Sequence, residues 1–263
     1  MLTSALLGLA VGLILALTGA GGGILAVPLL VFGTGVKVAE AAPIGLLAVG
    51  MAAALGAVLG LKAGAVRYRA ALLVAAAGML LAPAGLWAAR LVDGRWLGLL
   101  FAAILLYVTA RTYRQAAGNG PVQAARVPAC VRGPGTGRFV WTRPCARALA
   151  LSGAAAGFLS GLLGVGGGFV MVPALQRHTD LPIKPAVATS LAVIAIISAG
   201  GVATAAMHGA IEWGRAAPFA AGALAGMLGG RSLAARVAGP LLQKAFAAVS
   251  ALVAIGMIAR ALS

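Results

Sequence analysis

Apolar residues run nearly unbroken along this chain, in eight stretches separated by short clusters of charged and turn-forming residues. The stretches cover roughly residues 3–33, 41–62, 69–90, 95–114, 147–176, 185–207, 215–236 and 240–262. A helix needs about 20 apolar residues to cross the hydrocarbon core of a bilayer. Six stretches have about that length, and the first and fifth are longer by about ten residues. The pattern predicts an all-α integral membrane protein with about eight transmembrane segments.

The two long stretches share a glycine-rich phrase that is followed by a proline. The first phrase reads LTGAGGGILAVPLL (17–30) and the second reads LLGVGGGFVMVPAL (162–175). Glycine is a poor helix former, at about 1 kcal/mol relative to alanine, so three in a row favour unwinding. We therefore expect the first and fifth segments to be broken or kinked at GxGGG. Two forms of break stay open: a crossing with an irregular middle, or a segment that dips into the membrane and returns.

The two halves of the chain are repeats of one another. Gly19, Gly21, Gly22 and Gly23 align without gaps with Gly164, Gly166, Gly167 and Gly168, and Val27-Pro28 aligns with Val172-Pro173. A collinear set of this kind indicates an internal duplication. It predicts a first membrane repeat over 1–114, a basic Gly/Pro-rich linker over 115–146, and a second membrane repeat over 147–263. If each of the four segments in a repeat crosses once, both repeats have the same orientation.

Composition excludes a soluble protein. The chain is 62% hydrophobic and 9% charged, whereas a soluble domain has roughly 25% charged residues. The net charge of +16 does not predict a nucleic-acid partner, because the basic residues lie between apolar runs, where they orient membrane helices. Their distribution predicts that both termini and the linker lie in the cytoplasm, and the membrane lipids are the expected surroundings.

The cysteines and histidines predict no metal site and no cofactor. Cys130 and Cys145 both fall in the linker, and a cytoplasmic linker predicts free thiols. The sequence has no CxxC motif, and its two histidines, His178 and His208, lie far apart.

The glycine phrases are the candidate site for a ligand. Unwound backbone at membrane depth is tolerated only where it is covered by protein or lines a water-filled cavity. The free N–H groups at the start of the following half-helix attract an anion. A competing interpretation is that the glycines only allow helices to pack closely. Both interpretations stay open at this point.

Two further motifs follow the second phrase: KPAVATSLAVI (184–194) and HGAIEWGRA (208–216). With these, the chain resembles the TauE/SafE family of sulfite exporter-like permeases over nearly its whole length except the linker. The resemblance implies an exporter of small sulfur-containing anions such as sulfite, thiosulfate or organosulfonates, or a permease for another small organic anion. It implies binding near the midplane between the repeats, in a bacterial inner membrane. The first half departs from the motif, because Ile44-Gly45 stand where the second half has Thr189-Ser190.

We expect the anion to be bound by backbone N–H groups of the two glycine phrases and by neighbouring hydroxyls. A lone membrane hydroxyl usually bonds back to its own helix, which is the alternative for each. The candidate residues are Gly21, Gly22, Gly23, Gly166, Gly167, Gly168, Thr189, Ser190, Thr18 and Ser160.

Two other classes of protein, an enzyme and a scaffold, fit the sequence less well than a transporter. Ser160 and His208 could imitate the dyad of an intramembrane serine protease, but Ser160 lies within a series of small packing residues, so no enzyme is expected. A scaffold without substrate is disfavoured by the glycine phrases, because unwinding against lipid is costly. The oligomeric state stays open, with a homodimer as one candidate.

Overall fold

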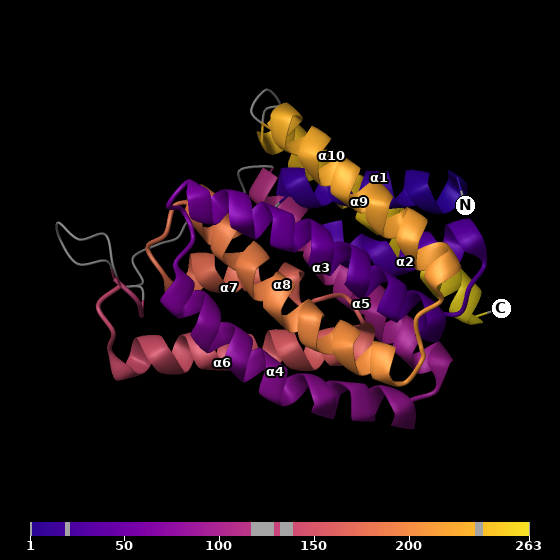
Figure 1. Ribbon diagram of the computed structural model, residues 1–263, viewed down its shortest axis with the longest axis horizontal. Coiled ribbons are helices and arrows are strands. Elements are labelled where there is room, and N and C mark those ends of the chain that lie inside the picture. Colours follow the sequence, from indigo (N-terminus) through magenta and orange to yellow (C-terminus); the bar gives the residue numbers. More distant parts are fainter. Residues whose placement is uncertain (1, 19–21, 117–128, 132–138, 235–238, 263) are drawn as a thin grey trace.

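The computed structural model describes residues 2–18, 22–116, 129–131, 139–234 and 239–262, and these ranges are almost entirely helical. The helices are α1 (Leu2–Thr18), α2 (Gly22–Thr34), α3 (Val38–Lys62), α4 (Tyr68–Leu91), α5 (Gly94–Ala116), α6 (Arg143–Leu163), α7 (Gly168–His178), α8 (Ile183–Met207), α9 (Trp213–Ala234) and α10 (Gly239–Leu262). Figure 1 shows α3 and α8 crossing the middle of the molecule, with α4 and α6 below them and α1, α9 and α10 above.

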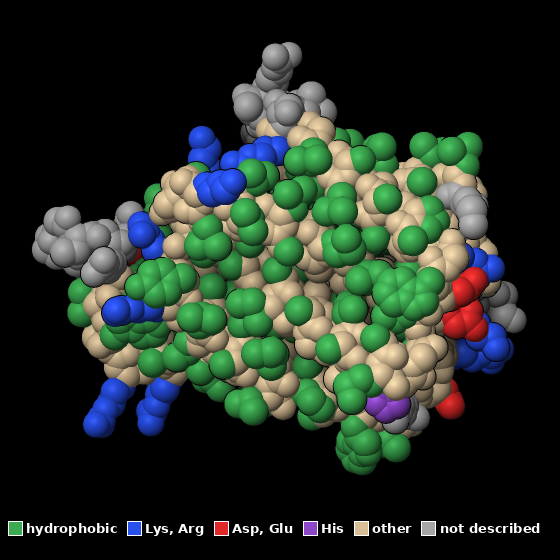
Figure 2. All heavy atoms as spheres, in the orientation of Figure 1, with side chains coloured by type: hydrophobic (Ala, Val, Ile, Leu, Met, Phe, Trp, Pro, Cys, Tyr) green, Lys and Arg blue, Asp and Glu red, His purple; other side chains and the backbone are tan. Residues whose placement is uncertain are grey.

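Length and composition make five of the described helices candidates for membrane crossing: α3, α4, α5, α6 and α8. Hydrophobic side chains cover most of the face shown in Figure 2, while Lys and Arg lie mainly toward its edges. Apolar surface of this extent is typical of a protein whose solvent is lipid. The predicted class, an all-α integral membrane protein, is confirmed.

The second glycine phrase is a turn at which the chain reverses. Helix α6 ends at Leu163 and α7 begins at Gly168. Between them Gly164, Gly166 and Gly167 have φ values of 68°, 71° and 64°, a left-handed conformation that glycine adopts without a Cβ penalty. A Cβ on Gly167 would overlap the carbonyl oxygen of Ala156. Helix α7 therefore folds back along the preceding turns of α6.

Helices α1 and α2 also pack against each other as a hairpin. A Cβ on Gly22 would overlap the backbone of Leu15, and one on Gly33 would overlap the side chain of Leu7. The start of α2 (Gly22) thus lies near the end of α1, and the end of α2 (Gly33) lies near the start of α1, so the two helices run antiparallel. Of the two forms of break left open above, this hairpin has the geometry expected for a segment that dips in and returns.

Glycines at four-residue spacing bring helices of the two halves together. Adding a Cβ at any of these positions would overlap the backbone of the facing helix, which is the close approach that small residues permit in lipid. In α1 against α9 the pairs are Gly8–Phe219 and Gly12–Ala223; in α6 against α4 they are Gly153–Val74 and Gly157–Gly78. The second set of pairs is related to the first by the sequence offset that relates the halves.

Helices α3 and α8 show how the halves are oriented. The two are equivalent in sequence, and they pack against each other in opposite directions: Gly50 faces Ser198, whereas Gly60 faces Ala188. Equivalent helices that run antiparallel indicate that one half is inverted relative to the other.

The described ends of the chain and the linker lie at opposite ends of the helix bundle. The ring of Phe32, near the end of α2, packs on Gly256 near the end of α10, and both chain ends lie together in Figure 1. At the other end, the N–H of Cys130 in the linker donates to the carbonyl of His178 at the end of α7. This arrangement, with the described chain ends and the linker at opposite ends of the bundle, differs from the sequence-based prediction that they share one face of the membrane.

The expected free thiols are a second correction. Cys130 and Cys145 form a disulfide, which ties the linker to the first turn of α6. The backbone of Cys130 also pairs with the segment after α7, since its carbonyl accepts the N–H of Asp180. The linker is thus attached at the start of α6 and the end of α7.

Candidate functional site

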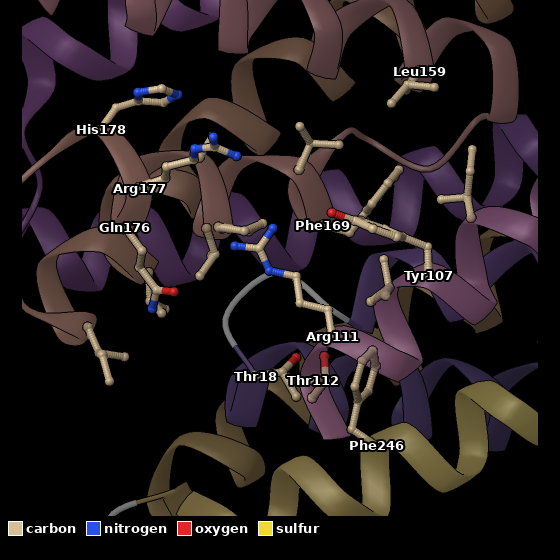
Figure 3. Close-up of a pocket in the computed structure, with 18 of the residues that line it drawn as sticks. Thr18, Tyr107, Arg111, Thr112, Leu159, Phe169, Gln176, Arg177, His178 and Phe246 are labelled. Carbon is tan, nitrogen blue, oxygen red and sulfur yellow. The ribbon is translucent and has the colours of Figure 1, made fainter. Parts of the chain in front are cut away.

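A cavity of about 620 Å³ lies between α5 and α7. Its walls also include the end of α1, the start of α8 and one residue each of α6 and α10. Figure 3 shows it with most of its lining residues. These are Leu17, Thr18, Ile104, Tyr107, Val108, Arg111, Thr112, Leu159, Phe169, Val170, Val172, Pro173, Ala174, Gln176, Arg177, His178, Ile183, Val187 and Phe246.

Two guanidinium groups give this cavity a positive charge. Arg111 extends from α5 and Arg177 from α7 into the same space (Figure 3). None of the described residues that line the cavity is acidic. His178 lies beside Arg177 at the linker end; burial, together with the charge of Arg177, lowers the pKa of His178 from its usual 6.5. A cationic cavity without carboxylates is suited to an anion.

The cavity extends inward to both glycine phrases. Leu17 and Thr18 are the last residues of α1, and Phe169 is the second residue of α7. The phrases themselves touch, because a Cβ on Gly23 would lie 3.2 Å from the carbonyl oxygen of Val165. The two turns thus come together at the inner end of a cationic cavity.

The predicted hydroxyls are mostly occupied by other contacts. Thr18 lines the cavity, but its hydroxyl donates to the Ile14 carbonyl at 2.7 Å and accepts the N–H of Gly22 at 3.2 Å. Thr189 accepts the backbone N–H of Arg67 at 3.1 Å. Ser190 donates back to the carbonyl of Ala186 at 2.9 Å. Thr189 and Ser190 are buried in the α3–α8 region rather than in the cavity wall.

The predicted glycines are buried at the two turns rather than in the cavity wall. Gly22, Gly23 and Gly166–168 are all buried, and Gly21 lies outside the described residues. Ser160 is buried in the last turn of α6, while His208 is exposed at the end of α8 with its Nδ1 2.7 Å from the Thr204 carbonyl.

Three residues of this region were missed from the sequence. Arg111 and Arg177 were interpreted only as charges that orient helices, although Arg111 lies within an apolar stretch and Arg177 closely follows the second phrase. Ser198 is fully buried, and its hydroxyl has no hydrogen-bond partner among the described residues. It lies 3.1 Å from the position that a Cβ on Gly166 would take, so it faces the second glycine turn. A single serine in an apolar helix gives no sequence signal for this.

In the other half, the position equivalent to this cavity is closed by side-chain packing. The sequence offset relates Arg177 to Phe32 and Arg111 to Gly256. There the Phe32 ring packs on Gly256, with Cζ 3.1 Å from the position of a Cβ on that glycine. Helices α5 and α7 thus border a cavity, whereas their equivalents α10 and α2 are in contact.

Comparison with known proteins identifies the family of this chain. Residues 4–257 match the family model described as "Sulfite exporter TauE/SafE". The chain is 34% identical to a "Probable membrane transporter protein" of Xylella fastidiosa (strain 9a5c), over 95% of this chain and 92% of that protein. A second Xylella fastidiosa protein of the same description, from strain Temecula1, is also 34% identical, over 95% of this chain and 92% of that protein.

A shorter match relates the chain to "Probable membrane transporter protein YunE" of Bacillus subtilis, at 44% identity over 22% of this chain and 21% of that protein. No solved structure matches. Because the family model and the first relatives cover nearly the entire chain, this multi-pass helical membrane protein belongs to the TauE/SafE family of membrane transporters.

Proposed function

We propose that this protein carries small anions across the membrane through the cavity between α5 and α7. The observation that carries the proposal is the pair of guanidinium groups, Arg111 and Arg177, that face one space reaching both glycine phrases. The family description names sulfite, and the proposed substrates are sulfite and similar sulfur-containing anions such as thiosulfate and small organosulfonates. Guanidinium binds their oxygens with charge-assisted hydrogen bonds.

The proposed topology has eight membrane segments, four in each half. Two of these, α1–α2 and α6–α7, are hairpins that enter and leave at the same face. Each half then crosses the membrane three times, by α3–α5 and by α8–α10. An odd number of crossings inverts the second half, and sites formed where inverted halves meet are the usual arrangement in secondary transporters.

Basic residues favour a cytoplasmic linker end. Among described side chains, ten basic residues lie at the linker end and three at the opposite end. The first set is Lys62, Arg67, Arg69, Arg111, Arg114, Arg143, Arg147, Arg177, Lys184 and Arg231; the second is Lys37, Arg95 and Arg215. By the positive-inside rule, the linker faces the cytoplasm of a bacterial inner membrane and both termini face outward.

The disulfide gives the opposite indication, because such bonds persist in oxidising compartments. We give the charges more weight, since ten residues against three outweigh one cysteine pair.

This orientation supports export. The cavity is bordered at the linker end by Arg177 and His178, so it receives anions from the cytoplasm. A membrane potential that is negative inside favours their exit by about 2.3 kcal/mol per charge and per 100 mV. The Phe32–Gly256 contact closes the equivalent path on the outer face. Transport then alternates between opening α5 from α7 and opening α10 from α2.

The test is flux of labelled sulfite, thiosulfate and methanesulfonate in proteoliposomes under an imposed potential. Arg111→Gln and Arg177→Gln each remove one charged donor from the cavity, and we expect a loss of about 1.5–3 kcal/mol of anion binding, or about 10- to 100-fold in affinity. Arg114→Gln is the matched control, because Arg114 lies on the same helix, is exposed and does not line the cavity.

Folding of each variant is checked by its elution profile and melting temperature in detergent. Flux that is lost in the two cavity variants and kept in Arg114→Gln supports the proposal. Equal flux in all variants would reject the cavity as the path, and the absence of flux for any anion tested would reject anion transport itself.

A further inference from the structure

The hydroxyl of Ser198 lies where the two halves of the protein meet. Ser198 belongs to α8 and is fully buried, and its hydroxyl makes no hydrogen bond with the described residues. The hydroxyl oxygen lies 3.1 Å from the position that a Cβ on Gly166 would take, in the second glycine turn. A Cβ on Gly50 of α3 would lie 2.7 Å from the Cβ of Ser198. Ser198 is therefore enclosed between the turn and the antiparallel helix of the other half.

Packing alone does not explain a serine at this position. Burying a hydroxyl without a hydrogen bond costs stability, and a serine in a membrane helix usually avoids the cost by donating to the carbonyl four residues earlier. Ser190 on the same helix does so, with the Ala186 carbonyl at 2.9 Å. The hydroxyl of Ser198 makes no such bond. The sequence offset relates Ser198 to Ala53, so the other half has an apolar side chain of nearly the same size.

The glycine turn beside Ser198 ends in further hydrogen-bond donors. Helix α7 has 11 residues and begins at Gly168, and the first N–H groups of a helix form the positive end of its dipole. The N–H groups of Gly168 and Phe169 make no hydrogen bond with the described residues. Phe169 also lines the cavity. The same turn therefore borders the cavity at Phe169 and faces Ser198 at Gly166.

The two guanidinium groups lie toward the other end of the cavity. Arg111 and Arg177 are both in the last two turns of helices that end on the linker side. Gly168, at the opposite end of α7, is about 13 Å along the helix axis from Arg177. An anion that moves inward to the turn leaves Arg177, so other donors have to replace this partner and the water that the anion has lost.

Helix α3 closes the space around Ser198 in this structure. A methyl group of Val49 lies 3.2 Å from the Cβ position of Gly23 and 3.7 Å from that of Gly166, so Val49 fills the space between the two glycine turns. Gly50, the next residue, covers Ser198. Because α3 and α8 belong to different halves, a movement of one half against the other uncovers the hydroxyl.

We infer that Ser198 is a second, inner binding residue for the anion, and that its hydroxyl donates to an anion oxygen after the anion has left Arg111 and Arg177. The N–H groups of Gly168 and Phe169 are its partners at this position. This inference rests on the proposed function and adds one step to its path. The ligand is an oxyanion, whose oxygens accept hydrogen bonds from neutral donors. A hydroxyl adds no charge, so the anion is not held there as it is between two guanidinium groups.

The test separates the rate of passage from binding at the cavity. Flux of labelled sulfite in proteoliposomes is measured over a range of concentrations under a fixed potential. Ser198→Ala is expected to lower the maximal flux by about 10- to 100-fold, the factor that one hydrogen bond to a charged group provides, and to leave the half-saturating concentration unchanged. Arg177→Gln is expected to raise the half-saturating concentration. Ser198→Cys keeps the size and a weaker donor, so its maximal flux is expected to be intermediate.

Ser250→Ala is the matched control. Ser250 of α10 is also fully buried without a hydrogen-bond partner among the described residues, and it does not line the cavity. Both alanine variants are expected to melt in detergent at or above the temperature of wild type, because each loses an unpaired buried hydroxyl.

A maximal flux that falls in Ser198→Ala alone, without a lower melting temperature, supports the inference. Unchanged flux in Ser198→Ala, an equal fall in Ser250→Ala, or a fall that accompanies a lower melting temperature would each overturn it. In these cases the response of Arg177→Gln still reports on the proposed function. Absence of anion flux in wild type would reject both.

Discussion

Glycine has two distinct purposes in this chain, and the contacts separate them residue by residue. Gly8, Gly12, Gly153 and Gly157 let helices touch backbone to backbone, and Gly164, Gly166 and Gly167 make a turn with positive φ. Four-residue spacing is typical of the first purpose, and the GxGGG phrase predicted the second. The partner helix of each packing glycine could not be predicted, because the spacing is the same whichever helix lies opposite.

The turn glycines offer a matched pair of substitutions. Gly167→Ala adds a Cβ at φ 64° and directs it onto the Ala156 carbonyl, whereas Gly209→Ala adds one at φ 63° with nothing within 4 Å. The Gly209 variant is expected to lose about 1–2 kcal/mol of stability from left-handed strain alone. The Gly167 variant is expected to lose clearly more. Melting temperatures in detergent compare the two, and equal losses would show that the α6–α7 contact is looser than described.

The cavity residues were harder to predict than the turns. Thr189 and Ser190 were favoured as hydroxyls of a family motif, yet their contacts are with Arg67 and Ala186. Arg111 and Arg177 were counted only as charges near helix ends. Whether a terminal arginine faces lipid head groups, water or a cavity depends on the neighbouring helix, and that neighbour comes from the other half or from a distant part of the same half.

His178 predicts how transport responds to pH. Because burial and Arg177 lower its pKa below 6.5, His178 is neutral at neutral pH. Acidification through that lowered pKa adds a positive charge beside Arg177, so the affinity for an anion is expected to rise as the pH falls through the lowered pKa of His178. Methanesulfonate is the suitable probe, since its own charge is constant in this range.

The comparison is made between wild type and His178→Gln, with the same pH inside and outside the vesicles. The variant is expected to match wild type at pH 7.5 and to lose the increase at acid pH. An increase that survives in the variant would assign the pH response to another group.

At the scale of elements, the helix breaks were predictable but their direction was not. A broken crossing and a hairpin have the same composition, the same glycines and the same proline. What decides between them is whether the second half-helix packs back on the first, as Gly33 does on Leu7. The disulfide was not predictable for a similar reason. The sequence shows that two cysteines lie in the linker, but the distance between them is set by how the linker lies against α6 and α7.

The disulfide is expected to stabilise the linker end of the bundle. It closes a loop with a sequence separation of 15 residues, for which the chain-entropy model gives about 3 kcal/mol. Purified oxidised protein should therefore melt at a higher temperature than protein treated with reductant. Cys145→Ser should melt like the reduced wild type and show no further response to reductant. Equal melting of oxidised and reduced wild type would contradict this role.

At the scale of the whole molecule, the sequence predicted the duplication of the two halves but not their inverted orientation. The matching residues predict that the halves are equivalent. Their relative orientation depends on whether each half crosses the membrane an odd or an even number of times. That parity follows from the hairpins, which only the three-dimensional contacts reveal. The antiparallel packing of α3 on α8, through Gly50 with Ser198 and Gly60 with Ala188, is its direct sign.

Inversion makes a prediction about where the ends of the chain lie. A reporter fused after residue 262 is expected outside the cell membrane, and the same reporter inserted in the linker is expected in the cytoplasm. Reporters that are active in only one compartment distinguish the two positions. Finding both fusions on the same side would contradict three crossings in each half.

The central claim is that access to the cavity alternates between α5–α7 on one face and α2–α10 on the other. The most direct measurement uses Phe32→Cys with Gly256→Cys in a background with Cys130→Ser and Cys145→Ser, joined by a short bifunctional methanethiosulfonate. The account predicts that anion flux in proteoliposomes stops on cross-linking and returns in the same sample after reduction. Undiminished flux through completely cross-linked protein would contradict it.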